Sequence, residues 1–156
     1  MNIVNTLDMP EESFESPHGK FAGIFKGLSI ALGRKPESTD LNERHPFDVE
    51  ITRVPAGQKN CPLHSQWEFY HVLSGSGFVR NETERKPIKS GDTFIFKPGE
   101  AHQLIGGKSE ELVILVVADN PIGETCYYPE SNKWLVRSPE RRLIRSKRID
   151  YFDGEE

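Results

Sequence analysis

The sequence has few cysteines and no long apolar run, and these absences exclude several classes of protein. Its two cysteines, Cys61 and Cys126, are too few for a disulfide framework and too isolated for a Cys-x-x-Cys pair. The longest apolar stretch, Leu112–Ala118, is far shorter than the roughly 20 residues that span a bilayer. Residues 1–20 are acidic and lack the pattern of a secretory signal. We therefore expect a cytoplasmic protein with reduced thiols and no membrane segment.

Positive charge is also scarce. The 20 Lys and Arg residues are outnumbered by 24 Asp and Glu, which gives a formal net charge of −4. This balance argues against a nucleic-acid partner, because such proteins usually carry a basic surface. A chain of 156 residues has the size of one domain and can bury a core without metals or disulfides.

From residue 47 onward the apolar residues alternate with polar ones. Phe47, Val49 and Ile51 alternate with Asp48, Glu50 and Thr52, which is the pattern of a strand with one buried face. Six further short strands are expected, and the Gly75–Gly77 and Ser90–Asp92 segments have the composition of tight turns. The six strands are Glu68–Leu73, Gly77–Arg80, Lys86–Lys89, Thr93–Phe96, Gln103–Ile105 and Leu112–Ala118. Closely spaced short strands indicate an antiparallel, all-β jelly-roll barrel.

The flanking segments are less regular. Lys20–Gly33 predicts at most a short helix that ends at Gly33, and residues 34–46 are typical of a surface loop. Near the C-terminus, the basic segment Arg137–Arg148 favours an edge strand around Ile144 over an RNA-binding strip. We expect one domain over residues 1–156, with a lead-in (1–46), a barrel core (47–118) and a C-terminal extension (119–156).

Three side chains are candidate metal ligands: His64, Glu68 and His102. Imidazole and carboxylate groups both bind first-row divalent metals, and a barrel brings distant parts of a chain to one opening. His71 has the opposite parity from Glu68 in the predicted strand, so we expect it to face away from the interior.

These residues lie in two segments that resemble the conserved motifs of the cupin superfamily. The segments are Gly57–Gly77 (GQKNCPLHSQWEFYHVLSGSG) and Gly91–His102 (GDTFIFKPGEAH). The whole chain is similar to small single-barrel cupins, so the resemblance implies a double-stranded β-helix barrel, a divalent metal and a homodimer. The first motif departs from the family pattern because it holds one histidine instead of two. His64 matches the first of the two when counted from Gly57 and the second when counted back from Glu68.

If a metal binds, the resemblance implies that His64, Glu68 and His102 are its ligands. Two histidines and one carboxylate leave coordination sites open for substrate or O₂, and Fe, Mn, Ni and Zn all remain candidates. Gln66 or Tyr70 is expected to hydrogen-bond to one of these metal-binding side chains and so to fix its orientation. Glu68 is the catalytic candidate, and it would act as a general base if metal is absent.

The interior of the barrel is the expected ligand pocket. Tyr70 has the parity of Glu68, so it should line the interior with Phe94 or Phe96, and Gln66 lies close by in the chain. These observations favour a protein that binds a small organic molecule at a metal site, as a metal-dependent oxygenase or isomerase. The alternative is a non-catalytic binding or sensing module with a degenerate metal site.

Overall fold

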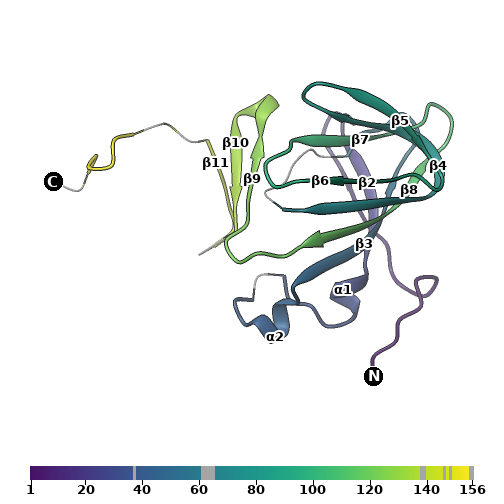
Figure 1. The fold of residues 1–156 in the computed structure, drawn as a ribbon, viewed down its shortest axis with the longest axis horizontal. Coiled ribbons are helices and arrows are strands. Elements are labelled where there is room, and N and C mark those ends of the chain that lie inside the picture. The colour runs from purple at the N-terminus through teal and green to yellow at the C-terminus, as the bar shows by residue number, and fades with distance from the viewer. Residues whose placement is uncertain (37, 61–65, 138–139, 146, 148, 155–156) are drawn as a thin grey trace.

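The chain folds into short antiparallel strands around a curled barrel (Figure 1). The computed structural model describes residues 1–36, 38–60, 66–137, 140–145, 147 and 149–154. Within these ranges, eight strands form the larger sheet: β1 (Glu12–Glu15), β2 (Ala22–Gly27), β3 (Phe47–Val54), β4 (Glu68–Asn81), β5 (Arg85–Lys89), β6 (Thr93–Phe96), β7 (His102–Gly106) and β8 (Leu112–Asp119). Three strands form a smaller sheet: β9 (Thr125–Tyr128), β10 (Lys133–Val136) and β11 (Arg142–Ile144).

The helices are single turns. They are α1 (Leu28–Ala31), α2 (Leu41–Arg44) and the 3-10 turn η1 (Pro129–Ser131). Within the described ranges, none of them has the length and hydropathy of a membrane-spanning helix.

Strand β4 organises the barrel because it pairs with four other strands. Its first half pairs with β8 on one side and β6 on the other, and its second half pairs with β5 and β7. A β-bulge between Val72 and Ser74 separates the halves, and bulges bend a strand and increase its twist. The curled sheet confirms the predicted all-β jelly-roll barrel with a short N-terminal helical segment.

The turn expected at Gly75–Gly77 is wrong, since β4 runs through it without interruption. Both glycines are required by close contacts between strands. Gly75 has φ +76°, and a Cβ there would overlap the carbonyl oxygen of Glu111. A Cβ on Gly77 would overlap the carbonyl oxygen of Ile105. The two predicted strands on either side are therefore one long strand.

Strand β3 is where it was predicted, but its apolar side chains are not the ones that face the interior. Thr52 and Val54 are buried, whereas Phe47 is half exposed. The start of β3 contacts α1, where the Ser29 hydroxyl accepts a hydrogen bond from the Val49 amide at 3.2 Å. Ile51, on the other face of β3, lines a surface pocket with Ile24 and Phe25 of β2.

The helix expected over Lys20–Gly33 is mostly a strand. Ala22–Gly27 forms β2, which pairs with both β1 and β3, and glycines at both of its ends disfavour a helix. The helical turn α1 does end at Gly33, whose φ of +105° supplies the left-handed cap, and the Arg34 amide donates to the Ser29 carbonyl. The loop expected at 34–46 contains the single turn α2.

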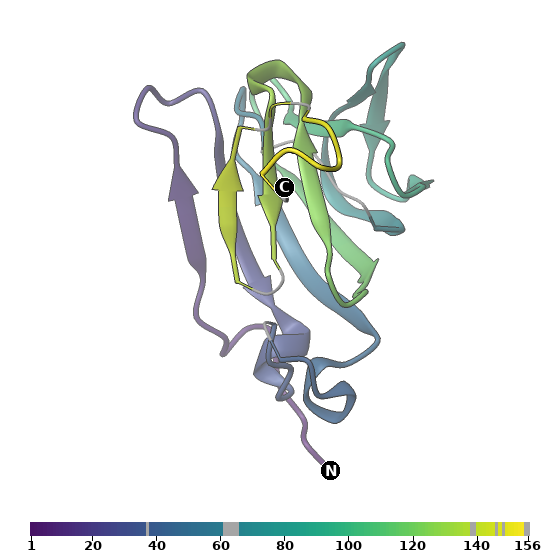
Figure 2. The same cartoon turned by 90° about the vertical axis from the view of Figure 1, so that its left-hand side faces the viewer.

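The smaller sheet lies against one side of the barrel and faces the viewer in Figure 2. Its strand order is β11-β10-β9, so β11 is an edge strand, as the basic C-terminal segment predicted. Cys126 and Leu135 are buried between this sheet and its surroundings, with Tyr128 packed against them.

The core of the barrel is apolar at one end. Val54, Val72, Leu112 and Ile114 have no exposed surface, and they pack in one cluster with Leu104 and Ile88. The segment 58–60 closes the gap beside β7, since the Gly106 amide donates to the Gln58 carbonyl and the Asn60 amide donates to the Leu104 carbonyl. The polar side chains of the interior gather at the opposite end.

Candidate functional site

Glu68 and His102 meet inside the barrel, as the sequence predicted. Glu68 is the first residue of β4 and His102 is the first residue of β7. Both side chains are almost completely buried, with 4% and 5% of their surface exposed. Glu68 Oε2 lies 2.9 Å from His102 Nε2. Folding therefore places a carboxylate oxygen against an imidazole nitrogen in a site that bulk water hardly reaches.

The other ring nitrogen of His102 has a fixed role. His102 Nδ1 lies 2.9 Å from the carbonyl oxygen of Glu100. Because a carbonyl oxygen only accepts hydrogen bonds, Nδ1 must carry the proton and donate it. Nε2 is then an acceptor for the Tyr70 hydroxyl, which lies 2.8 Å away, and Glu68 Oε2 lies 2.9 Å from the same nitrogen. The lone pair of Nε2 can therefore serve either the Tyr70 hydroxyl or a cation that Glu68 and His102 share.

Three aromatic rings enclose this pair. The Tyr70 hydroxyl lies 2.8 Å from His102 Nε2, so Tyr70 is the neighbour that holds the imidazole. Phe96 stacks on the His102 ring with centroids 4.0 Å apart, and Phe94 stacks on Tyr70 at 5.1 Å. Tyr70 is buried and packs with Phe94 and Phe96, as the alternation of β4 predicted. The rings fix the orientation of His102 and exclude water from one side of it.

Tyr70 keeps its proton over a wide pH range. Burial, the negative charge of Glu68 and its hydrogen bond, and the more distant charge of Glu50 together raise the pKa of the Tyr70 hydroxyl well above its usual range. Tyr70 is therefore a hydrogen-bond donor at neutral pH.

A cavity of about 350 Å³ adjoins Glu68 and Tyr70, whereas His102 lies behind them and lines a different pocket. One part of its wall is apolar and includes Phe25 and Leu104. The other part is polar and consists of Glu50, Thr52, Asn60, Glu68, Tyr70 and Arg137. The volume lies in the range of small-molecule sites, and the wall joins an apolar part to a set of polar groups that could orient a ligand.

The remaining predicted site residues have different positions. His64 lies outside the described residues. Gln66 is buried and its side-chain amide donates to the Asp119 carbonyl at 2.6 Å, so it contacts the end of β8. His71 contacts the Thr93 hydroxyl at 2.9 Å. Among the residues that the structure describes, no three His, Cys, Asp or Glu side chains come together as a metal site.

Four residues of the polar wall were missed from the sequence: Glu50, Thr52, Asn60 and Arg137. The Thr52 hydroxyl donates to Glu50 Oε1 at 2.7 Å, and Asn60 Oδ1 accepts from the Leu104 amide at 2.8 Å. Glu50 was hidden because its strand has apolar residues on both faces. Arg137 was missed because it is the first residue of a basic segment that was predicted to form an exposed edge strand. The one signal in the sequence was that Asp48 and Glu50 lie two residues apart, so that both side chains point to the same face of the strand.

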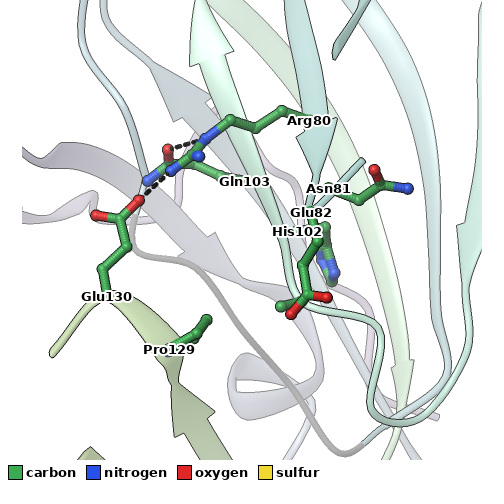
Figure 3. A pocket seen from close by; sticks show the side chains of 8 residues that line it. Arg80, Asn81, Glu82, His102, Gln103, Pro129 and Glu130 are labelled. Carbon is green, nitrogen blue, oxygen red and sulfur yellow. Dashed lines mark hydrogen bonds and ion pairs between the residues drawn. The ribbon is translucent and has the colours of Figure 1, made fainter. Parts of the chain in front are cut away.

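A second pocket of about 220 Å³ lies between the barrel and the turn η1, next to His102 (Figure 3). Arg80 crosses this pocket, and its guanidinium contacts Gln103 Oε1 at 2.8 Å and Glu130 Oε1 at 2.5 Å. These contacts attach the C-terminal part of the chain to the barrel, and both charged side chains are at least one-third exposed.

The known proteins that this chain resembles agree with the barrel and its two motifs. The sequence model of the cupin domain family matches residues 36–118, which is more than half of the chain. The chain belongs to the cupin family. The match includes β3 to β8 and therefore both Glu68 and His102.

Solved structures share this fold, two of them over nearly the full length of this chain and a third over about three quarters of it. A protein provisionally named a sugar phosphate isomerase from Acidithiobacillus ferrooxidans is 24% identical, with a TM-score of 0.76 and coverage of 95% of this chain and 96% of that one. A sugar phosphate isomerase of the cupin superfamily from Silicibacter pomeroyi is 19% identical, with a TM-score of 0.75 and coverage of 96% and 98%. A predicted oxalate decarboxylase from Thermotoga maritima is 20% identical, with a TM-score of 0.61 and coverage of 77% and 100%. At these identities the likeness is one of fold.

Proposed function

We propose that this cupin is an isomerase that acts on a small hydroxy-carbonyl compound, and that Glu68 and His102 hold a divalent metal ion beside the substrate. The observation that carries the proposal is the 2.9 Å approach of Glu68 Oε2 to His102 Nε2 at the wall of a small-molecule cavity. His64 is the proposed third ligand. Two structures of similar length whose names are those of sugar phosphate isomerases support the choice of reaction.

The donor set fits a metal such as Fe, Mn, Ni or Zn. A metal-binding histidine usually donates its other ring N–H to a carbonyl or carboxylate, and His102 does this through Glu100. Carboxylate and imidazole together suit divalent ions of the first transition row. When bound, such an ion polarises a carbonyl or hydroxyl oxygen and lowers the pKa of a bound hydroxyl group.

The protein's own residues would carry the proton transfer. Isomerisation of a hydroxy-carbonyl compound moves a proton from the carbon that bears the hydroxyl to the neighbouring carbonyl carbon, and a second proton from the hydroxyl oxygen to the former carbonyl oxygen. With Glu68 engaged by metal, Glu50 is the carboxylate on the cavity wall that can accept and return this proton, and Thr52 orients it. Tyr70 would donate a hydrogen bond to a substrate oxygen, because it stays protonated.

Metal analysis joined to an activity assay tests the proposal. We expect about one equivalent of metal per chain after metal-supplemented expression, and interconversion of aldose and ketose phosphates followed by NMR. His102→Ala should lose both, whereas His71→Ala, a histidine that contacts Thr93, should lose neither. Absence of metal and of turnover from the wild-type protein would contradict the proposal. Oxygen consumption by iron-loaded protein would instead identify an oxygenase that uses the same ligands.

The second candidate is a non-catalytic module that binds or senses a small molecule. It is favoured by the contacts of His102, whose Nε2 already has the Tyr70 hydroxyl at 2.8 Å and whose ring is stacked on Phe96. Nε2 needs no metal when the Tyr70 hydroxyl donates to it. This candidate predicts a thermal shift with a sugar, acid or phenolic compound that persists in metal-free protein, and the isomerase predicts a shift that disappears.

We also infer a homodimer in the cytoplasm. The edge strand β11 exposes Leu143 and Ile144, and an edge strand with exposed apolar side chains is a ready surface for pairing with a second copy. Light scattering should give a mass of two chains for the wild-type protein and one for Leu143→Lys. A monomeric wild-type protein would contradict this inference.

A further inference from the structure

Arg137 is the basic side chain of the cavity wall, and the fold holds it firmly. It directly follows β10, and its amide donates to the carbonyl oxygen of Glu124, the residue directly before β9. Its side chain returns to the same residue, with Arg137 Nε 2.7 Å from Glu124 Oε2. Main chain and side chain thus fix Arg137 to the end of the β9–β10 hairpin.

Glu124 is well suited to orient the guanidinium. Only 3% of its side chain is exposed, and its other oxygen, Oε1, accepts from the Cys126 thiol at 3.2 Å. The side chain of Arg137 is 26% exposed and lines the same cavity as Glu68 and Tyr70. A guanidinium carries five N–H donors in a planar fork, so it can bind more than one partner, and its geometry matches the oxygens of phosphate and carboxylate.

Other positive charges lie close to Arg137. Arg34 and Arg44 are both buried, and Arg34 is paired with Asp48 at 3.2 Å. The pKa of Arg34 is lowered mainly by burial, and the charges of Arg137 and Arg44 lower it further, against Asp48 and Glu124. The charges of Arg137 and Arg44 thus both reach Arg34.

The formal charge of the cavity wall becomes positive only when a divalent ion is bound. Its charged wall residues are Glu50, Glu68 and Arg137, which sum to −1. A divalent ion held by Glu68 and His102 would change this sum to +1. A ligand that carries a negative group would then neutralise the excess, and Arg137 is the residue of the wall that can contact it.

We propose that Arg137 is the anion anchor of the cavity, so that the ligand carries a phosphate or carboxylate at Arg137 and its hydroxy-carbonyl group at Glu68 and His102. This inference rests on the proposed small-molecule site and adds the class of substrate. A cavity of about 350 Å³ accommodates a phosphorylated sugar of a few carbons.

Calorimetric titration of the metal-loaded full-length chain tests the anchor. The probes are dihydroxyacetone phosphate, dihydroxyacetone, glycerate and inorganic phosphate. Arg137→Gln should weaken the affinity for dihydroxyacetone phosphate by about ten-fold or more, because hydrogen bonds to charged groups contribute about 1.5–3 kcal/mol. The affinity for dihydroxyacetone should not change. The matched control is Arg142→Gln on β11, whose side chain is 66% exposed, and it should bind all probes as the wild type does. Stronger binding of glycerate than of the phosphate probes would identify a carboxylate ligand.

The outcomes separate this inference from the proposed function. Equal binding of dihydroxyacetone phosphate by wild type and Arg137→Gln overturns the anchor. The proposed isomerase function is then tested separately, by metal content and turnover. If the wild-type protein binds the phosphate probes but holds no metal, and Arg137→Gln does not bind them, the anchor is supported and the metal site is contradicted. If Arg137→Gln unfolds, Arg137→Lys keeps the charge without the planar fork, and unchanged binding by that variant would equally overturn an anchor based on paired N–H groups.

Discussion

The two ends of the barrel differ in what their side chains do. At one end, Val54, Val72, Leu112 and Ile114 are fully buried and wholly apolar. At the other end, the same strands supply polar groups: Glu50 on β3, and Glu68 and Tyr70 on β4. The register aligns these layers, since Ile114 lies between Thr52 and Val72, and Val116 lies between Glu50 and Tyr70. Each strand thus changes from apolar to polar over one or two inward-facing residues.

This difference indicates a division of work between the ends. Buried apolar surface stabilises a fold, whereas buried polar groups contribute little net free energy and are costly when a partner is missing. The apolar end should therefore hold the barrel together, and the polar end should bind and react. Three substitutions test this division, in order of expected effect.

The largest effect is expected at the apolar end. Leu112→Ala removes a fully buried side chain and leaves a cavity, which typically costs about 2–5 kcal/mol of unfolding free energy. Urea unfolding measures the loss. Leu115→Ala is the matched control, because Leu115 lies on the same strand with the opposite parity and is only half buried. The division of work would be wrong if both variants lost the same stability, or if Leu112→Ala lost metal from its folded fraction.

The polar end should respond in the opposite way. Replacing Glu68, Tyr70 and His102 together by Leu, Phe and Leu exchanges a buried polar cluster for apolar groups, which is often neutral or stabilising by about 1–4 kcal/mol. The triple variant should unfold at the same or a higher urea concentration and bind neither metal nor ligand. Glu68→Leu alone should be less stable than the triple variant, because it leaves His102 and Tyr70 buried without their carboxylate. A triple variant that unfolds several kcal/mol more easily would show that the polar end stabilises the barrel.

The apolar end and the strands were predictable because their signals are local. The strands β5 to β8 coincide with the predicted ranges to within one residue at nearly every end, since period-two alternation and turn residues act within a few positions. The merging of two strands at Gly75 and Gly77 was not predictable, because the contacts that require glycine come from Glu111 and Ile105, which are distant in the chain. Local composition cannot distinguish a turn glycine from a glycine beneath another strand.

The polar end was predictable only in part. The meeting of Glu68 and His102 followed from the two motifs, and the parity of β4 placed Tyr70 beside them. Glu50 was missed because most apolar side chains of its strand lie on the opposite face, which the alternation predicted to be the buried one. Arg137 was missed because its position depends on the pairing with Glu124. Such information is tertiary, so no pattern within a strand carries it.

The smallest effect is expected for the ion pair at the rim of the polar end. Glu130→Gln breaks the contacts of Glu130 with Arg80 and Lys20, and Glu130 is about half exposed, so the loss at neutral pH should stay below about 1 kcal/mol. The hydrogen bond and charge of Arg80 lower the pKa of Glu130, so its contribution is present above the unfolded value of about 4.3 and disappears as pH falls through the lower folded value. Urea unfolding of both proteins at neutral and acidic pH should therefore converge in acid, and Glu84→Gln, which breaks only the local pair with Lys86, is the control. A loss above about 2 kcal/mol would exceed what an exposed pair supplies, and would mean that the rim, and not only the apolar end, holds the barrel together.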